Sequence, residues 1–442
     1  MSLKVLGALV AATGLTLPWL AIWLVGGAHG FSTLTTVAIS GIGILGASFL
    51  LTWGAETAEK DVPRAFAIAV LAVLAVAPEY AVDALYAWNA GQFAGTERGI
   101  EAGNLAVANM TGANRILIGV GWAGIALFTI LRAGAAADTA VKKQRGFLAD
   151  VVTLDRDIAV EIAFLLAATA WAFAVPLGGG IDILDVVVLV GLYVLYLLVI
   201  IRGDVDEAGE EHVGVPAALQ QVPNPYRALT VLALFAYSGL LIFVAVEPFA
   251  HGLEKLGTSV GIPSFFMIQW IAPLASESPE LVIVTLLVLK SRSTAGFNAL
   301  VSSKLNQWTL LIGTLAVVHS IALGQYGALM FDQKQAAEIW LTAAQSFFAI
   351  ALIVDFRISV REACVLFVLF ASQVGAEFLA IRGIIELPVS SYELLLMFTG
   401  LYVVLGTALF VARRDAVARL VGDVSDTVSG AISSGGQPQS AD

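Results

Sequence analysis

Apolar residues occur along this chain in long runs that short polar stretches separate. A helix of about 20 apolar residues crosses the hydrocarbon core of a bilayer. The pattern therefore predicts an all-α polytopic membrane protein with about twelve transmembrane spans. The predicted spans are about 5–27, 33–53, 63–90, 102–131, 158–176, 181–201, 228–247, 260–289, 295–320, 338–354, 360–382 and 392–412.

The longer polar stretches predict how the spans are grouped. Residues 202–227, acidic and then proline-containing, form a linker that divides the chain into membrane halves at 1–201 and 228–412. Spans 2 to 6 and 7 to 11 then make two five-helix repeats, with extra terminal helices. An odd number of helices in each repeat predicts that the copies are inverted in the membrane. The tail, residues 413–442, is rich in Ser, Gly, Asp and Gln and is predicted to be disordered.

Composition and charge support this class and orient the chain. Hydrophobic residues make up 59% of the sequence and charged residues 13%, which excludes a water-soluble globule of this length and makes the lipid bilayer its surroundings. A net charge of -11 argues against binding of nucleic acid. The two ends and the even-numbered loops hold 17 of the 23 Lys and Arg, and the odd-numbered loops hold 4. Lys and Arg favour the cytoplasmic side, so both termini, the linker and the tail are predicted to be cytoplasmic, in the plasma membrane.

Several kinds of chemistry lack their residues. The single cysteine, Cys364, excludes a disulfide framework and a multi-thiolate metal cluster. The four histidines are scattered, without the spacing of zinc or haem ligands. No mid-membrane signature of a hydrolase is present, so the chain is not expected to be an enzyme or to carry a cofactor.

Two stretches almost 200 residues apart each place a Pro-Glu pair within a predicted span. The glutamates are Glu79 and Glu280, accompanied by Asp83 four residues later and Glu277 three residues earlier, so each carboxylate pair shares a helix face. A carboxylate at the bilayer centre costs several kcal/mol unless it is paired, protonated or bound to a cation. The preceding proline removes a backbone hydrogen bond and favours a helix break. Because the motif is duplicated, Glu79 and Glu280 are predicted to bind a transported metal cation.

The span after each motif begins with Asn and small residues. The spacing from Asn104 to Gly119 equals that from Asn298 to Gly313, so the two spans align without a gap. Amide, hydroxyl and carboxylate oxygens are the ligands of hard cations such as Na⁺ and Ca²⁺. Hydrogen bonding between packed helices explains a single Asn or Ser equally well. One face of the first span carries Asn104, Ala108, Gly112 and Arg115, and the equivalent residues of the second are Asn298, Ser302, Asn306 and Thr309.

In these motifs the chain resembles the sodium/calcium exchanger family of the calcium/cation antiporter superfamily. The Pro-Glu pairs look like those of the family, and Gly103–Asn109 and Phe297–Ser303 look like its Gly-Asn-x-x-Gly-Ser-Asn helix. The resemblance implies inverted repeats at about 72–120 and 273–314, and a secondary-active antiporter that works by alternating access and exchanges Ca²⁺ for Na⁺. The candidate cation ligands are Glu79, Glu280, Asn306, Ser302, Ser276, Asn104, Asn298, Asp83 and Glu277.

Departures from the family pattern leave two coupling ions possible, Na⁺ and H⁺. Ala108 stands where the family has Ser, Gly112 stands where it has a polar ligand, and Ala75 replaces a hydroxyl. A desolvated carboxylate readily binds a proton, so a thinned ligand set favours proton-coupled exchange, Ca²⁺/H⁺ or Na⁺/H⁺, as the alternative. A cation channel is a more remote alternative, because neither repeat contains an obvious pore loop.

Two basic residues, Arg115 and Lys304, lie well inside predicted spans, away from the span ends. An unpaired cation there costs several kcal/mol, so each is expected to pair with an intramembrane carboxylate such as Asp83, Glu277 or Glu79. Both are candidates for charge compensation. Arg115 is also a candidate to take the place of a bound ion, whereas a packing role is favoured for Lys304.

Overall fold

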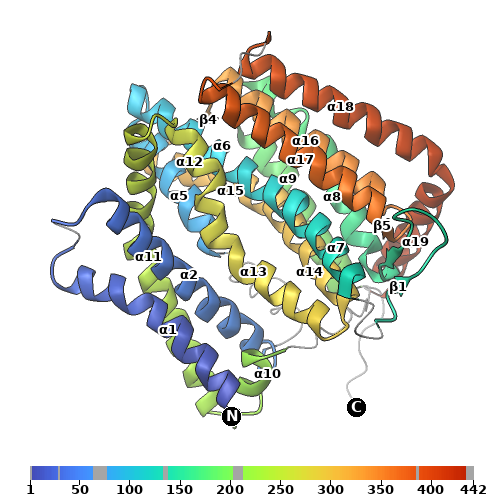
Figure 1. Ribbon diagram of the computed structural model, residues 1–442, viewed down its shortest axis with the longest axis horizontal. Helices are drawn as coiled ribbons and strands as arrows, with labels where there is room; N and C mark the ends of the chain where they lie inside the picture. Colours follow the sequence, from blue (N-terminus) through green and yellow to red (C-terminus); the bar gives the residue numbers. More distant parts are fainter. Residues whose placement is uncertain are drawn as a thin grey trace. The chain divides into compact units, whose positions relative to one another are not determined.

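A computed structural model describes residues 2–27, 30–62, 77–132, 138–202, 213–384 and 388–434, and nearly all of them are helical (Figure 1). Within these ranges, eleven helices are long and apolar enough to cross a membrane. They match eleven of the twelve predicted spans. The other prediction, 63–90, has residues 63–76 outside the described ranges, and its remainder is the helix α5 (Ala77–Gln92). The expected all-α polytopic class is confirmed.

The elements follow one another in two series, before and after the linker. The first series contains α1 (Leu3–Leu24), α2 (Thr33–Ala58), α5, α6 (Glu97–Ile116), η2 (Leu117–Trp122), α7 (Ala123–Arg132), β1 (Val141–Lys142), β2 (Val151–Thr153), η3 (Arg156–Ile158), α8 (Ala159–Ala172), η4 (Val175–Gly178), β3 (Gly180–Ile181) and α9 (Ile183–Arg202). The second contains α10 (Val215–Leu219), α11 (Tyr226–Ser259), α12 (Ser264–Trp270), α13 (Ala272–Leu289), α14 (Ser293–Asn306), η5 (Gln307–Leu311), α15 (Ile312–Leu323), β4 (Leu329–Met330), α16 (Gln333–Ile353), β5 (Arg357–Ser359), α17 (Val360–Ile381), α18 (Ser391–Ala412) and α19 (Arg414–Ser434).

The chain forms two compact units, and each takes segments from both halves of the sequence. The first unit consists of residues 1–113, 211–283 and 318–331. The second consists of residues 114–210, 284–317 and 332–442. The two halves of the sequence are therefore interleaved, and α6, α13 and α15 each begin in one unit and end in the other.

Close helix packing defines the first unit. The helix α2 packs along α1 and α11, and α11 also contacts α5 and α12 (Figure 1). A Cβ added at Gly46 of α2 would lie 2.6 Å from the carbonyl oxygen of Ala12, so a glycine is required where α1 and α2 meet. Small residues at such contacts let helices approach closely when lipid supplies no hydrophobic driving force.

Polar contacts fix the linker to the first unit. The Arg227 Nε donates to Asp61 Oδ2 at 2.6 Å, and its Nη1 donates to the carbonyl oxygens of Gln220 and Val222 at 3.1 and 2.8 Å. The Lys60 Nζ donates to the same Gln220 carbonyl at 2.6 Å. The guanidinium beside Asp61 lowers the pKa of that carboxyl group. The end of α2 and the start of α11 are thereby held together.

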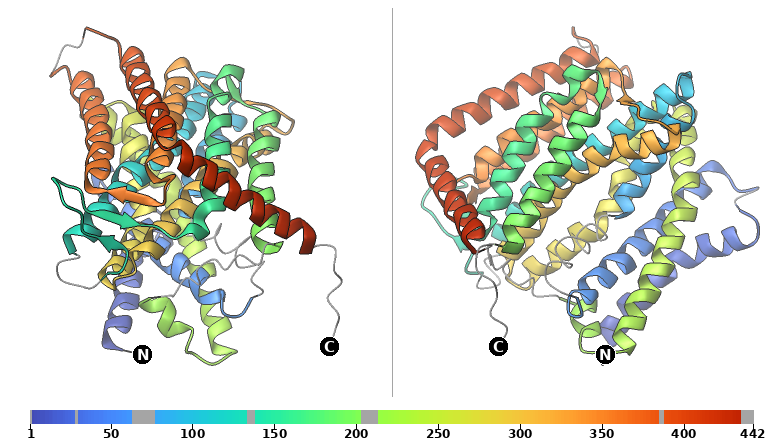
Figure 2. Two further views of the ribbon diagram at one scale, coloured as in Figure 1. Left: turned by 90° about the vertical axis from the view of Figure 1, so that its right-hand side faces the viewer. Right: turned by 180° about the vertical axis from the view of Figure 1, so that it is seen from behind.

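A small antiparallel sheet, in the order β1-β2-β5, lies in the second unit (Figure 2). Val151 pairs with both Lys142 and Ser359. The strands belong to the loops after the fourth and tenth predicted spans, so these loops lie on one side of the membrane, as the alternation of spans requires. The sequence did not predict the sheet, because strands of two or three residues carry almost no periodic signal.

The tail differs from its predicted disorder. Residues 414–434 form α19, which packs against α8 and α9. Ala416, Leu420 and Ala431 are buried on one face of this helix. Apolar residues at helical spacing are diluted in the average composition of the tail, and for that reason composition alone predicted disorder.

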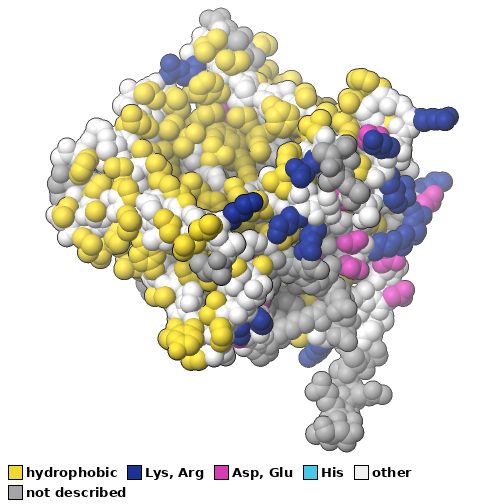
Figure 3. Space-filling model, turned by 60° about the horizontal axis from the view of Figure 1, so that its bottom comes forward, with side chains coloured by type: hydrophobic (Ala, Val, Ile, Leu, Met, Phe, Trp, Pro, Cys, Tyr) yellow, Lys and Arg dark blue, Asp and Glu magenta, His cyan; other side chains and the backbone are white. Residues whose placement is uncertain are grey.

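The surface of the molecule suits lipid. Hydrophobic side chains cover much of the face in Figure 3, whereas Lys and Arg gather with Asp and Glu on one part of it. Large apolar side chains such as Leu3, Leu131 and Phe243 are exposed. Together with the apolar helices, this surface identifies an integral membrane protein.

Candidate functional site

Carboxyl groups from both Pro-Glu motifs lie together in the first unit. The Glu79 carboxyl group lies beside that of Glu277, and Asp83 and Glu280 are near enough for their charges to act on it. Glu79 and Asp83 lie one turn apart on α5, and Glu277 and Glu280 lie on α13. The exposed fractions of Glu79, Asp83 and Glu277 are 2%, 0% and 3%, and Glu280 is half-buried. Four acidic groups thus share a largely water-free environment.

Several buried oxygens in this unit receive no hydrogen bond from the described part of the chain. The Asn109 Nδ2 donates to Asp83 Oδ1 at 3.0 Å. The donor-free oxygens are both carboxyl oxygens of Glu79, Asp83 Oδ2, Asn109 Oδ1 and Gln269 Oε1. A buried polar atom without a partner costs about 1–3 kcal/mol, and more if it is charged. Such oxygens are suited to bind a cation or a proton. Asn109 and Gln269 were not among the candidate ligands predicted from the sequence.

The acidic groups do not form a complete metal site by themselves. Within the described ranges, no three His, Cys, Asp or Glu side chains are arranged to hold a metal ion. A cation at this place would therefore also need amide, hydroxyl or carbonyl oxygens. These are hard ligands that Ca²⁺ and Na⁺ accept.

The helix break expected at the second Pro-Glu motif occurs elsewhere. The helix α13 runs through Pro279 without interruption, and the break lies at Ile271, where α12 ends. Proline removes only one helical hydrogen bond. Two hydroxyl groups of the same helix also hydrogen-bond to its carbonyl oxygens: Ser276 Oγ donates to the Pro273 carbonyl at 3.3 Å, and Ser278 Oγ donates to the Leu274 carbonyl. The prediction of a break at Pro279 is wrong.

The amide and hydroxyl candidates are divided between the two units. Asn104 is half-buried on α6 in the first unit. Asn298, Ser302 and Asn306 lie on α14 in the second unit, where Asn306 is buried and the Asn298 Oδ1 receives no hydrogen bond from a described residue. Their participation in cation binding stays a prediction.

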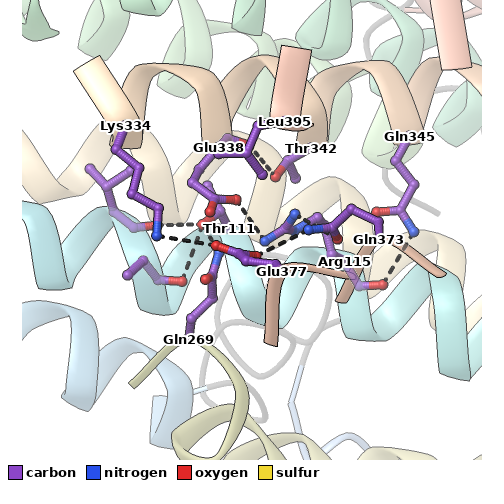
Figure 4. A network of polar contacts seen from close by, with 12 residues as sticks. Thr111, Arg115, Gln269, Lys334, Glu338, Thr342, Gln345, Gln373, Glu377 and Leu395 are labelled. Carbon is purple, nitrogen blue, oxygen red and sulfur yellow. Dashed lines mark hydrogen bonds and ion pairs between the residues drawn. The ribbon is translucent and has the colours of Figure 1, made fainter. Parts of the chain in front are cut away.

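Arg115 forms a buried ion pair in the second unit. Its Nη2 lies 2.7 Å from Glu338 Oε2, and its Nη1 donates to Gln373 Oε1 at 3.1 Å (Figure 4). The exposed fractions of the Arg115 and Glu338 side chains are 1% and 0%. The sequence predicted that Arg115 pairs with an intramembrane carboxylate, which is confirmed. The partners named were Asp83, Glu277 and Glu79, whereas the structure pairs Arg115 with Glu338. Glu338 stood at the edge of a predicted span, where a carboxylate needs no buried partner.

The polar network continues from Gln373 to a second ion pair. The Gln373 Nε2 donates to Glu377 Oε2 at 3.2 Å, and Lys334 Nζ lies 3.1 Å from Glu377 Oε1 (Figure 4). Gln373 thus links two ion pairs, Arg115 with Glu338 and Lys334 with Glu377. We call Arg115, Glu338, Glu377 and Lys334 the four-charge cluster.

Lys304 is fully buried in the second unit. Its Nζ donates to Asn114 Oδ1 at 2.6 Å and lies 4.1 Å from the centre of the Trp308 ring. A cation over an aromatic face is attracted by the ring electrons. These contacts support the packing role favoured for Lys304.

Both polar spans contain a short π-helical segment, η2 after α6 and η5 after α14. The segments are not at equivalent residues of the alignment, but each follows directly on the helix that carries the Asn-rich motif. Such segments are rare and often occur at functional sites.

The structure is similar to several solved structures. The structure is similar to a crystal structure of the H⁺/Ca²⁺ exchanger CAX, with a TM-score of 0.84 and 39% identity over 97% of this chain and 99% of that chain. It also resembles native YfkE, with a TM-score of 0.57 and 13% identity over 83% of this chain and 99% of that one. The sodium-calcium exchanger NCX_Mj matches with a TM-score of 0.48 and 14% identity, over 78% of this chain and 98% of that one.

The sequence comparison gives the family. No curated protein matches the chain. The family model described as sodium/calcium exchanger protein matches residues 31–202 and 230–378, which is most of the sequence. The chain therefore belongs to the sodium/calcium exchanger family, and it is a cation antiporter.

Proposed function

We propose that this antiporter exchanges Ca²⁺ for protons across the membrane by alternating access. The observation that carries the proposal is the group of buried, donor-free oxygens in the first unit, supplied by Glu79, Asp83, Asn109 and Gln269. Hard oxygen ligands of this kind suit Ca²⁺, and two or more carboxylates balance its charge.

The arrangement of the carboxyl groups favours protons as the counter-ion. The carboxyl groups of Glu79 and Glu277 lie side by side, with two more carboxyl groups close by. Like charges at such short range cannot all persist, so a counter-ion must take the place of Ca²⁺ when it leaves, and buried carboxylates readily accept protons in that role. The missing oxygens at Ala108 and Gly112 leave fewer ligands for additional Na⁺ ions. The solved structure that is 39% identical is that of an H⁺/Ca²⁺ exchanger, which supports the same coupling.

Transport in proteoliposomes tests the coupling ion. With an acidic lumen and no Na⁺, we expect the purified protein to accumulate external Ca²⁺, and a protonophore should abolish this accumulation. With Na⁺ inside and equal pH on both sides, we expect no accumulation. The opposite pattern would establish Ca²⁺/Na⁺ exchange, and Na⁺-driven proton movement without Ca²⁺ uptake would establish Na⁺/H⁺ exchange. Ca²⁺ flux that needs no counter-ion would indicate a channel.

The protein is proposed to lie in the plasma membrane, and the distribution of Lys and Arg predicts that both termini are cytoplasmic. Gln144 is exposed in the loop between β1 and β2, which this topology places in the cytoplasm. In a Cys364→Ser background, Gln144→Cys should not react with an impermeant thiol reagent added to intact cells, and it should react after permeabilisation. Labelling of intact cells at this position would reverse the proposed orientation.

A further inference from the structure

The side-chain amide of Gln269 has a buried oxygen with no hydrogen-bond donor. Gln269 is 0% exposed and lies at the end of α12, two residues before the break at Ile271. Its Nε2 lies 3.4 Å from Thr111 Oγ1 (Figure 4), and its Oε1 receives no hydrogen bond from the described residues. Gln269 belongs to neither duplicated motif, and no pattern in the sequence singles it out.

The neighbours of Gln269 determine which end of its amide faces Thr111. The Thr111 hydroxyl donates its single proton within α6, where the Val107 carbonyl oxygen is 2.8 Å away. The hydroxyl oxygen can then only accept from Gln269, so the amide nitrogen must face Thr111. The amide oxygen is consequently left as an acceptor without a hydrogen-bond donor.

A glycine on α6 allows Gln269 to come this close. A Cβ added at Gly112 would lie 1.8 Å from the Gln269 carbonyl oxygen and 2.8 Å from its Cγ. Any other residue at position 112 would push the end of α12 away. Gly112 lacks a side-chain oxygen, and the space that a side chain would fill is occupied by Gln269.

The same turn of α6 leads to the acidic groups. Asn109, three residues before Gly112, donates to Asp83 Oδ1 at 3.0 Å. Residues 109–112 of α6 therefore contact both Asp83 and Gln269. The acidic side chains alone do not complete a metal site, so a neutral oxygen at this place would add a ligand that they lack.

We infer that Gln269 is a further cation ligand of this site and helps to select Ca²⁺, an inference that rests on the proposed function. Ca²⁺ takes six to eight oxygens at flexible distances, whereas Mg²⁺ demands a tight octahedron and keeps several waters. An added neutral oxygen on a side chain held by Thr111 and Gly112 raises the ligand number without adding charge. Gln269 should therefore favour the larger divalent ion.

The variant Gln269→Met tests this role, because it keeps the length of the side chain and removes the amide. Ca²⁺ binding to the purified protein is measured by isothermal titration calorimetry, together with the KM for Ca²⁺ in proteoliposomes. We expect the Kd for Ca²⁺ to rise about tenfold or more, as is typical when a metal site loses a supporting group. Gln335→Met is the matched control, because Gln335 is also buried with a donor-free Oε1 but lies in the second unit. Its Kd should stay at the wild-type value.

A second variant, Gln269→Glu, keeps the side-chain oxygen, replaces the amide nitrogen by a second oxygen and adds a negative charge. It should bind Ca²⁺ and shift the ratio of the Ca²⁺ and Mg²⁺ dissociation constants, so it tests the role even if Gln269→Met does not fold. A folded Gln269→Met protein with wild-type Kd, or a Gln269→Glu protein with an unchanged ratio, would overturn the inference. If Glu79→Gln loses Ca²⁺ binding while Gln269→Met retains it, only the role of Gln269 falls. If both retain it, the proposed cation site falls as well.

Discussion

Replacing Glu79 with glutamine is expected to abolish Ca²⁺ exchange in proteoliposomes while leaving the protein folded. Glutamine keeps the volume of the side chain but removes the charge that offsets dehydration of the cation. The Glu79 carboxyl group lies beside that of Glu277, and neither of its oxygens accepts a hydrogen bond from an N–H or hydroxyl group of a described residue, so the substitution removes no such bond. A loss of several kcal/mol of ion binding corresponds to a reduction of transport by about 100-fold or more. Glu280→Gln should fail in the same way.

A carboxylate elsewhere in the first unit provides the control for these variants. Glu247 lies on α11, its side chain is 67% exposed, and it has His251 as a neighbour one turn away. Glu247→Gln should therefore transport Ca²⁺ at the wild-type rate. Thermal unfolding in detergent would show whether each variant is folded. Near-normal transport by folded Glu79→Gln would make Glu79 a helix-packing residue instead of a ligand.

Replacing Arg115 with glutamine is expected to lower the free energy of unfolding by about 3–5 kcal/mol, because it leaves Glu338 buried without its cation. The effect should appear as a lower Tm in detergent. Replacing both partners, Arg115→Leu with Glu338→Leu, should recover most of the loss, since a buried ion pair can often be exchanged for apolar side chains at little cost.

The ion pair of Arg156 with Asp423 serves as the exposed control for the buried pair of Arg115 with Glu338, since its side chains are 65% and 37% exposed. Arg156→Gln should change the free energy of unfolding by less than about 1 kcal/mol. If Arg115→Gln were as stable as wild type, the ion pair would not hold the second unit together. The reversal potential of the active Arg115→Gln protein tests the separate idea that Arg115 takes the place of an ion, and an unchanged potential would remove it.

The spans could be predicted well because a membrane helix leaves a long, continuous apolar signal. Helix ends outside the bilayer leave none. The span expected at 228–247 continues as α11 to Ser259, through Pro248. The prediction ended too early because the last three turns of this helix are polar enough to look like a loop. The β1-β2-β5 sheet is likewise invisible in the sequence, since its pairing joins strands about 200 residues apart.

The candidate site was predictable where a residue is unusual by itself. Glu79, Asp83, Glu277 and Glu280 are charged residues in apolar surroundings, and duplication drew attention to them. Gln269 is uncharged and unduplicated, and its proposed role depends on Thr111 and Gly112, which are more than 150 residues away in the chain. The partnership of Arg115 with Glu338 is similarly a property of the folded chain and of no local pattern.

The four-charge cluster also bears on the response of the transporter to membrane voltage. A charge that crosses the full membrane field changes its energy by about 2.3 kcal/mol for every 100 mV. With Glu338 and Glu377 ionised, their charges cancel those of Arg115 and Lys334. A displacement of the whole cluster as one body would then carry no gating charge. The voltage sensitivity of the exchange cycle should therefore come from the transported ions and from the carboxylates that bind them.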